Sequence, residues 1–180
     1  MKNQNTKKLA YAALFLALCL ALPMLTGQIP QIGSMLLPMH IPVLLCGLVC
    51  GWQYGAAVGF VAPLLRSVLF GMPPMYPVAI AMAFELLTYG LVIGLVYRRM
   101  AQKGAAGVYA ALLTAMVAGR LVWGVAEVVL LGLGGKAFTA QTFLAGALLN
   151  AVPGIIVQLV LIPAVMAVLQ KAGAVKEYAE

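Results

Sequence analysis

Residues 76–98 read YPVAIAMAFELLTYGLVIGLVYR, and Glu85 is the only charged side chain before Arg98 at the end of the stretch. An α-helix needs roughly 20 apolar residues to cross the hydrocarbon core of a bilayer, which is about 30 Å thick. The stretch therefore predicts a membrane-spanning helix with one intramembrane carboxylate. Other apolar stretches predict spans in the same way, at residues 8–24, 38–54, 55–71, 106–133 and 141–170. We expect an all-α fold, an integral membrane bundle of six transmembrane helices in a single domain over residues 1–180.

The composition of the chain argues against a soluble globular protein. Of its 180 residues, 64% are apolar and only 8% are charged, whereas a soluble domain carries about 25% charged residues. The net charge of +7 does not indicate nucleic-acid binding, because the Lys and Arg residues are spread over the ends of apolar stretches and form no basic face. We expect the lipid bilayer to surround the protein, and we expect no nucleic-acid partner.

The basic residues predict how the bundle is oriented. With six spans, eight of them fall on one side of the membrane: Lys2, Lys7, Lys8, Arg98, Arg99, Lys103, Lys171 and Lys176. Lys136 lies in a loop on the other side. Because Lys and Arg concentrate in cytoplasmic loops, both termini of this multi-pass protein are predicted to be cytoplasmic.

Segments rich in glycine and proline separate the predicted spans. Residues 26–34, 71–77 and 132–136 cannot continue a lipid-facing helix, and the topology places all of them on the outer side. The spans 38–54 and 55–71 are joined tightly around Gly51-Trp52-Gln53-Tyr54-Gly55, which predicts a helical hairpin.

Four ionisable side chains fall within predicted spans, and each requires a partner or a function because a charge in the membrane is costly. They are Arg66, Glu85, Arg120 and Glu127. One interpretation is purely structural, with Glu85 paired to one arginine and Glu127 to the other. The other is that some of them line a cavity and bind a polar ligand. Arg66 and Glu127 lie near the outer loops, and the other two lie deeper.

Other polar and aromatic residues extend this set. Trp123 follows Arg120 by three residues, and Asn150 and Gln158 lie in the last predicted span, where each is either a packing contact or a ligand contact. His40, between Pro38 and Pro42, is either a cap or a ligand contact, and Met35, Met39, Met72 and Met75 are candidates for an apolar rim. The predicted substrate-binding residues are Arg66, Glu85, Arg120, Trp123, Glu127, Asn150 and His40.

Catalytic and metal-binding patterns are missing from the sequence. It contains no GxSxG, HExxH or GxxxxGKS motif, no Asp, and a single His. Cys19, Cys46 and Cys50 form no CxxC pair, and we interpret them as small packing residues. We therefore expect no enzymatic activity, no catalytic residue, no metal and no cofactor.

The first predicted span carries a stripe of small residues. Ala13, Ala17 and Ala21 recur every four residues, so they share one helix face. Such stripes allow another helix to approach closely within a membrane. The partner is either another helix of this chain or a separate subunit.

The chain as a whole resembles the S components of energy-coupling-factor (ECF) transporters. The resemblance lies in its size, the alanine stripe, and three segments: Leu37-Pro38-Met39-His40-Ile41-Pro42-Val43-Leu44-Leu45-Cys46-Gly47, Met82-Ala83-Phe84-Glu85-Leu86-Leu87-Thr88-Tyr89-Gly90, and Val152-Pro153-Gly154-Ile155-Ile156-Val157-Gln158. It covers nearly the whole chain, through loose patterns and no strict signature.

The resemblance implies a substrate-binding subunit in a bacterial plasma membrane. Such subunits bind a vitamin-like molecule near the outer face and associate through the stripe Ala13, Ala17 and Ala21 with a membrane coupling subunit carried on two ATPases. The ligand stays open: two arginines favour a carboxylate such as pantothenate or folate, whereas Glu85 and Glu127 favour a donor-rich deazaguanine related to queuosine. The alternatives are a self-sufficient small carrier or channel, and a membrane enzyme or assembly factor.

Overall fold

The computed structural model describes residues 2–25, 35–135 and 151–173. Within these ranges the chain is all-α and has no strand, which confirms that part of the predicted fold class. The α-helices are α1 (Lys2–Leu25), α3 (His40–Cys50), α4 (Trp52–Phe70), α5 (Ile80–Met100), α6 (Ala105–Leu133) and α8 (Val152–Lys171). A π-helical turn, η1 (Met75–Ala79), precedes α5, and a 3-10 turn, η2 (Ala101–Lys103), follows it.

Five of the described segments are long and apolar enough to cross a membrane, namely those of α1, α4, α6 and α8 and the continuous η1–α5 segment. The helix α3 is the exception, because its 11 residues extend only about 16 Å at 1.5 Å per residue. The predicted span 38–54 is therefore too long. The chain turns at Gly51 alone, where φ is 94°, and residues 52–55 already belong to α4. The last predicted span began at 141, and its residues 141–150 lie outside the described ranges.

The short helix α3 lies inside the bundle. All of its residues except Ile41 are buried, and it packs against α1, α4, α5 and α8. Because neighbouring helices surround it, α3 does not have to span the lipid by itself. Its first residue, His40, is thereby held deep in the interior of the protein at 1% exposure.

Glycines allow α4 and α5 to approach very closely. A Cβ added at Gly90 would overlap the backbone of Gly55, and one added at Gly59 would overlap the backbone of Leu86. In a membrane, where lipid tails are as apolar as leucine, close backbone packing is a main source of helix association. This contact fixes α5, which carries Glu85, against the rest of the bundle.

We expect Gly90→Ala to destabilise the protein. The added methyl group meets backbone atoms that cannot rotate away, so α5 must move from α4, at a cost of about 1–3 kcal/mol. Thermal unfolding in detergent measures the effect. Gly132→Ala is the matched control, because a Cβ there has no neighbour within 4 Å, and its unfolding temperature should be unchanged or slightly raised. Equal unfolding temperatures for the two variants would contradict the close α4–α5 contact.

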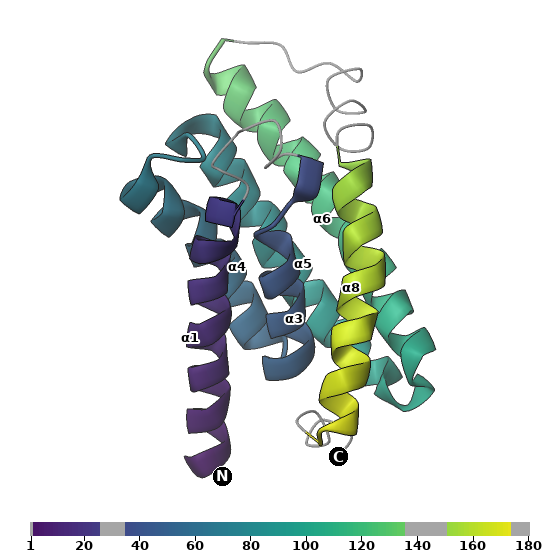
Figure 1. The fold of residues 1–180 in the computed structure, drawn as a ribbon. Helices are drawn as coiled ribbons and strands as arrows, with labels where there is room; N and C mark the ends of the chain where they lie inside the picture. Colours follow the sequence, from purple (N-terminus) through teal and green to yellow (C-terminus); the bar gives the residue numbers. More distant parts are fainter. Residues whose placement is uncertain (1, 26–34, 136–150, 174–180) are drawn as a thin grey trace.

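The segment between α4 and α5 is the predicted break at 71–77. The helix α4 ends at Gly71, which has φ of 67° and donates its N–H to the Ser67 carbonyl at 2.9 Å. Beyond it, the Tyr76 hydroxyl donates to the carbonyl of Leu130 near the end of α6. The break therefore connects the upper ends of three helices in the view of Figure 1.

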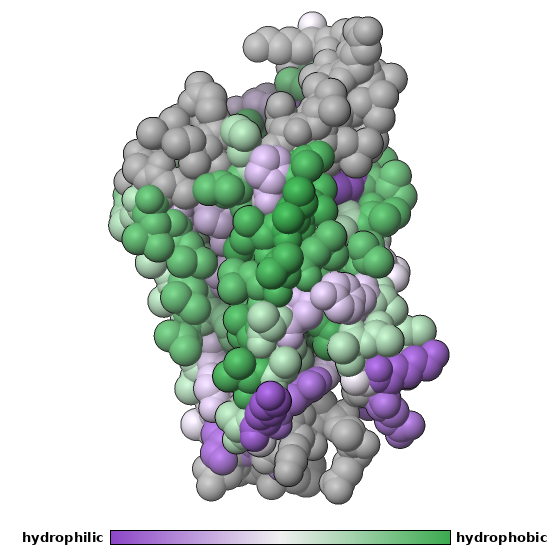
Figure 2. Space-filling view, turned by 45° about the vertical axis from the view of Figure 1, so that its right-hand side comes forward, coloured by the Kyte–Doolittle hydropathy of each residue, from purple (hydrophilic) through white to green (hydrophobic). Residues whose placement is uncertain are grey.

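The start of α1 and the end of α8 lie at the same end of the bundle. In Figure 1 the start of α1 and the end of α8 point downward, as does the connection between α5 and α6. Figure 2 shows hydrophilic side chains at this lower end and a broad apolar flank above them. The predicted clustering of basic residues at one end therefore agrees with the helix arrangement, and its cytoplasmic orientation remains a prediction. Of these residues, Lys176 lies outside the described ranges, as do Lys136 and the loop at 26–34.

Candidate functional site

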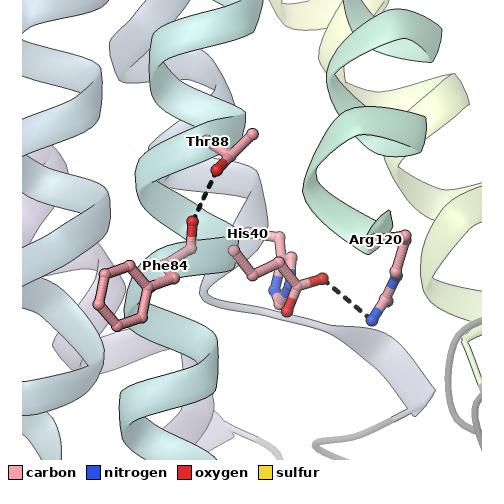
Figure 3. A network of polar contacts seen from close by, with 5 residues as sticks. His40, Phe84, Thr88 and Arg120 are labelled. Atoms are coloured by element: carbon pink, nitrogen blue, oxygen red, sulfur yellow. Dashed lines mark hydrogen bonds and ion pairs between the residues drawn. The ribbon is translucent and has the colours of Figure 1, made fainter. Parts of the chain in front are cut away.

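A buried ion pair joins α5 to α6. Arg120 Nη1 lies 3.0 Å from Glu85 Oε1, and the side chains are 13% and 2% exposed. Figure 3 shows Arg120 reaching from α6 toward α5 beside His40, whereas the ring of Phe84 points the other way. The prediction that Glu85 pairs with one of the two arginines is thus confirmed. The surroundings of the pair decide whether it has a further role.

His40 brings α3 to the same place. Its Nε2 lies 3.6 Å from Glu85 Oε1, and its ring meets that of Tyr89 edge to face, with centroids 5.3 Å apart. Sequence analysis missed Tyr89, although its position four residues after Glu85 places both on one face of α5. A Cβ at Gly119 would overlap the Tyr89 ring, so this glycine is what makes room for the tyrosine between α5 and α6.

The hydrogen bonds of this cluster are incomplete. Among the described residues, no hydrogen-bond partner is found for either ring nitrogen of His40 or for Nε and Nη2 of Arg120. Glu85 Oε1 also lacks a hydrogen bond, although Arg120 Nη1 and His40 Nε2 both lie near it. Buried polar groups are nearly always hydrogen-bonded, so a set of unmet groups in one place indicates a missing water, ion or ligand.

Gln158 belongs to the same side of the bundle. It is 1% exposed, and its amide nitrogen has no hydrogen-bond partner among the described residues. Gly154, one turn earlier in α8, lies against the backbone of Met35 and Leu36, immediately before α3. Because positions four apart share a helix face, Gln158 faces the start of α3, where His40 lies.

Trp123 and Glu127 continue the face of α6 that begins at Arg120. The guanidinium carbon of Arg120 lies 5.9 Å from the centre of the Trp123 ring, within the range of a cation–π contact. Glu127 is 6% exposed, and no ion pair joins it to another residue in the described ranges. The prediction that Glu127 pairs with the second arginine is therefore wrong.

The second arginine has a different role. Arg66 is 2% exposed, its guanidinium donates a hydrogen bond to the carbonyl of Leu20, and it lies 5.1 Å from the centre of the Phe70 ring. The hydrogen bond to Leu20 ties α4 to α1, and the contact with Phe70 lies within α4. Within the described residues, no hydrogen bond or ion pair joins Arg66 to the His40, Glu85 and Arg120 cluster.

Some predicted residues lie elsewhere. Asn150 lies outside the described residues. Met35 and Met75 are exposed, as expected for a rim, but Met39 is 4% exposed and belongs to the core. Cys19, Cys46 and Cys50 are buried free thiols. In the described part of the chain, no three His, Cys, Asp or Glu side chains gather closely enough to hold a metal ion.

The alanine stripe faces outward. Ala13, Ala17 and Ala21 are exposed, whereas Phe15 and Cys19, on the other side of α1, are buried. In the described part of the bundle, the stripe is therefore not a packing face for a helix of this chain. The other partner considered, a separate subunit, stays a prediction.

A groove between α5 and α6 is distinct from the polar cluster. Its volume is about 410 Å³, and its lining is wholly apolar and includes Phe84, Leu121 and Val125. All three of these side chains are more than a third exposed. Such a groove faces the region of lipid and offers no hydrogen bond to a polar ligand.

Comparison with known proteins gives one match. A family model described as "ECF transporter, substrate-specific component" matches residues 7–166. No curated protein and no solved structure matches the chain. The matched range contains α3, α5 and α6 and thus the whole cluster of His40, Glu85 and Arg120.

Proposed function

Because this chain belongs to the family of substrate-specific components of ECF transporters, we propose that it captures a water-soluble vitamin or related micronutrient at the outer face of the membrane. A coupling module would then drive uptake of the bound molecule with ATP. The family consists of transporter subunits and not of enzymes, and its membership implies a small-molecule substrate and an ECF module as partner. Pantothenate, folate and a queuosine-related deazaguanine are the candidate substrates.

The observation that carries this proposal is the buried polar cluster on α3, α5 and α6. A charged side chain in a membrane span is costly, and it is retained where it lines a cavity or a substrate pathway. Here Glu85 and Arg120 satisfy each other only in part, and His40 and Arg120 keep unmet hydrogen-bonding groups. A bound polar molecule would satisfy these groups. We propose that His40, Glu85, Arg120, Trp123 and Glu127 contact it, together with Asn150, whereas Arg66 anchors α1.

The arrangement of the helices supports an outward-facing site. His40 is the first residue of α3, and this end of α3 points away from the end of the bundle that holds both termini (Figure 1). With the basic end in the cytoplasm, the cluster lies toward the outer face. We propose this orientation in a bacterial plasma membrane, with residues 1–180 forming a single transmembrane domain.

The exposed stripe on α1 supports a partner in the membrane. Small side chains at Ala13, Ala17 and Ala21 permit a helix to approach α1 closely. We propose that a membrane coupling subunit docks there, and that it is carried on two ATPase subunits that supply the energy.

Two measurements test the proposal. The first is mass spectrometry of small molecules released by denaturing the detergent-purified protein, where a single vitamin-like compound near equal stoichiometry is expected. The second compares uptake of that compound by cells expressing this chain with and without the coupling subunits. Accumulation is expected only with the coupling subunits. Accumulation by the chain alone would mean that it is a self-sufficient carrier.

A further inference from the structure

The guanidinium of Arg120 uses one nitrogen in the ion pair and leaves the edge formed by its other two nitrogens without a partner. Its Nη1 pairs with Glu85, whereas Nε and Nη2 are buried and lack a hydrogen-bond partner among the described residues. The guanidinium is planar and rigid, so the N–H groups of Nε and Nη2 point in parallel from one edge. This fork matches the two oxygens of a carboxylate, and such bidentate pairs are among the strongest hydrogen bonds in proteins.

The unmet nitrogens of Arg120 can only donate. Among the described residues, the other buried side-chain atoms without a hydrogen-bond partner are both ring nitrogens of His40, the amide nitrogen of Gln158 and Oε1 of Glu85. Glu85 Oε1 already pairs with Arg120 Nη1, and an imidazole ring can both donate and accept. A partner for the open edge of Arg120 must therefore supply two acceptors. On the premise of the proposed function, we propose that the transported molecule carries a carboxylate and that this group binds the Nε and Nη2 edge of Arg120.

Neither Glu127 nor Arg66, the other two ionisable residues within the predicted spans, takes the place of a ligand at this edge. Glu127 lies seven residues after Arg120, about 10 Å along the helix axis at 1.5 Å per residue, and makes no ion pair with any described residue. Arg66, the other buried arginine, donates a hydrogen bond to Leu20 of α1 and contacts Phe70 of its own helix α4. The Nε and Nη2 edge of Arg120 can therefore bind one carboxylate.

Glu127 then constrains the other end of the ligand. About two helical turns separate position 127 from position 120, and Trp123 lies between them on the same face of α6. An ionised carboxylate at position 127 would accept hydrogen bonds from a hydroxyl, amide or amine group. The inferred substrate class is an organic monocarboxylate with donor groups at the far end. A neutral heterocycle without a carboxylate would leave the open edge of Arg120 without its bidentate partner.

Matched acids and neutral analogues test this inference. The detergent-purified protein is incubated with pantothenate and panthenol, nicotinate and nicotinamide, and biotin and biotinamide, together with thiamine and riboflavin. A second sample is incubated with yeast extract. Compounds retained after desalting are identified by mass spectrometry. We expect a carboxylate to be retained, and its neutral analogue to be absent or much weaker.

Variants of the two arginines assign the carboxylate to its partner. Arg120→Lys keeps the charge beside Glu85 but removes the fork, so affinity for the retained acid should fall roughly ten- to a hundredfold, as expected when a charge-assisted hydrogen bond is lost. Arg66→Lys is the matched control and should retain the acid. Thermal unfolding of both variants verifies that they remain folded.

The outcomes separate the inference from the proposed function. Retention of thiamine, riboflavin or another compound without a carboxylate would overturn the inference and leave the capture role intact. So would equal retention of an acid and its neutral analogue, or an unchanged affinity in Arg120→Lys. Retention of no compound from either sample would contradict the proposed function itself, and the inference with it.

Discussion

Ala17→Trp is expected to abolish assembly with the coupling subunit while ligand retention stays at the level of the unmodified protein. Ala17 is exposed in the middle of the stripe formed by Ala13, Ala17 and Ala21. An indole at this position holds a partner helix several ångströms away, and the close backbone contact that stabilises helix pairs in membranes is lost. The ligand site is unaffected, because it lies on α3, α5 and α6. Co-purification of the coupling subunits measures assembly, and mass spectrometry measures the bound ligand.

Tyr11→Trp is the matched control for this variant. Tyr11 is 44% exposed on α1, and it lies six residues before Ala17, about 120° away around the helix axis at 3.6 residues per turn. We expect Tyr11→Trp to assemble normally, because it adds an indole outside the stripe. If Ala17→Trp lost assembly and ligand together, the stripe would be a packing face needed for folding. If both variants assembled, the coupling subunit would dock elsewhere.

Glu85→Leu is expected to lower the stability of the protein and to abolish ligand binding. The substitution leaves Arg120 without its partner at a site where the arginine side chain is only 13% exposed. Removing one member of a buried ion pair costs about 3–5 kcal/mol, because the remaining charge is uncompensated. The unfolding temperature in detergent and the retention of the ligand by the purified variant are the two measurements.

The double variant Glu85→Leu with Arg120→Met separates stability from binding. Both charges are then replaced by apolar side chains, and exchange of a buried ion pair for apolar residues is often neutral or stabilising. We expect the unfolding temperature to recover most of its loss while ligand binding remains absent. Recovery of both would show that the pair serves only to hold α5 against α6. A Glu85→Leu variant as stable as the unmodified protein would mean that Arg120 reaches water in the native bundle.

The membrane-spanning character of the chain could be predicted from sequence because it depends on local composition. Long apolar stretches must form helices in lipid, where every backbone hydrogen bond has to be made within the segment. The predicted spans 76–98 and 106–133 agree with the helical segments Met75–Met100 and Ala105–Leu133 to within a few residues. The short helix α3 is the exception. Its length is decided by the turn at Gly51 and by the burial of α3 among other helices.

The chemistry of the site was only half predictable. Sequence identifies Glu85, Arg120, Glu127 and Arg66 as costly residues that need partners, because each one interrupts an apolar stretch. The sequence does not show which of these residues pair with each other. The structure pairs Arg120 with Glu85 and turns Arg66 toward the carbonyl of Leu20, whereas no ion pair joins Glu127 to another described residue.

The sequence by itself determined that this protein is a helical membrane bundle. It also determined which residues carry a charge that is costly within the membrane, and where a row of alanines lies on the first helix. Each of these follows from residue type and helical periodicity, which act along the chain. Only the tertiary structure decided that His40, Tyr89 and the Glu85–Arg120 pair meet, and that Gly119 makes room for the ring of Tyr89. Those contacts depend on how closely α3, α5 and α6 approach one another, and a helix's own sequence pattern fixes which face it buries but not which side chain lies opposite.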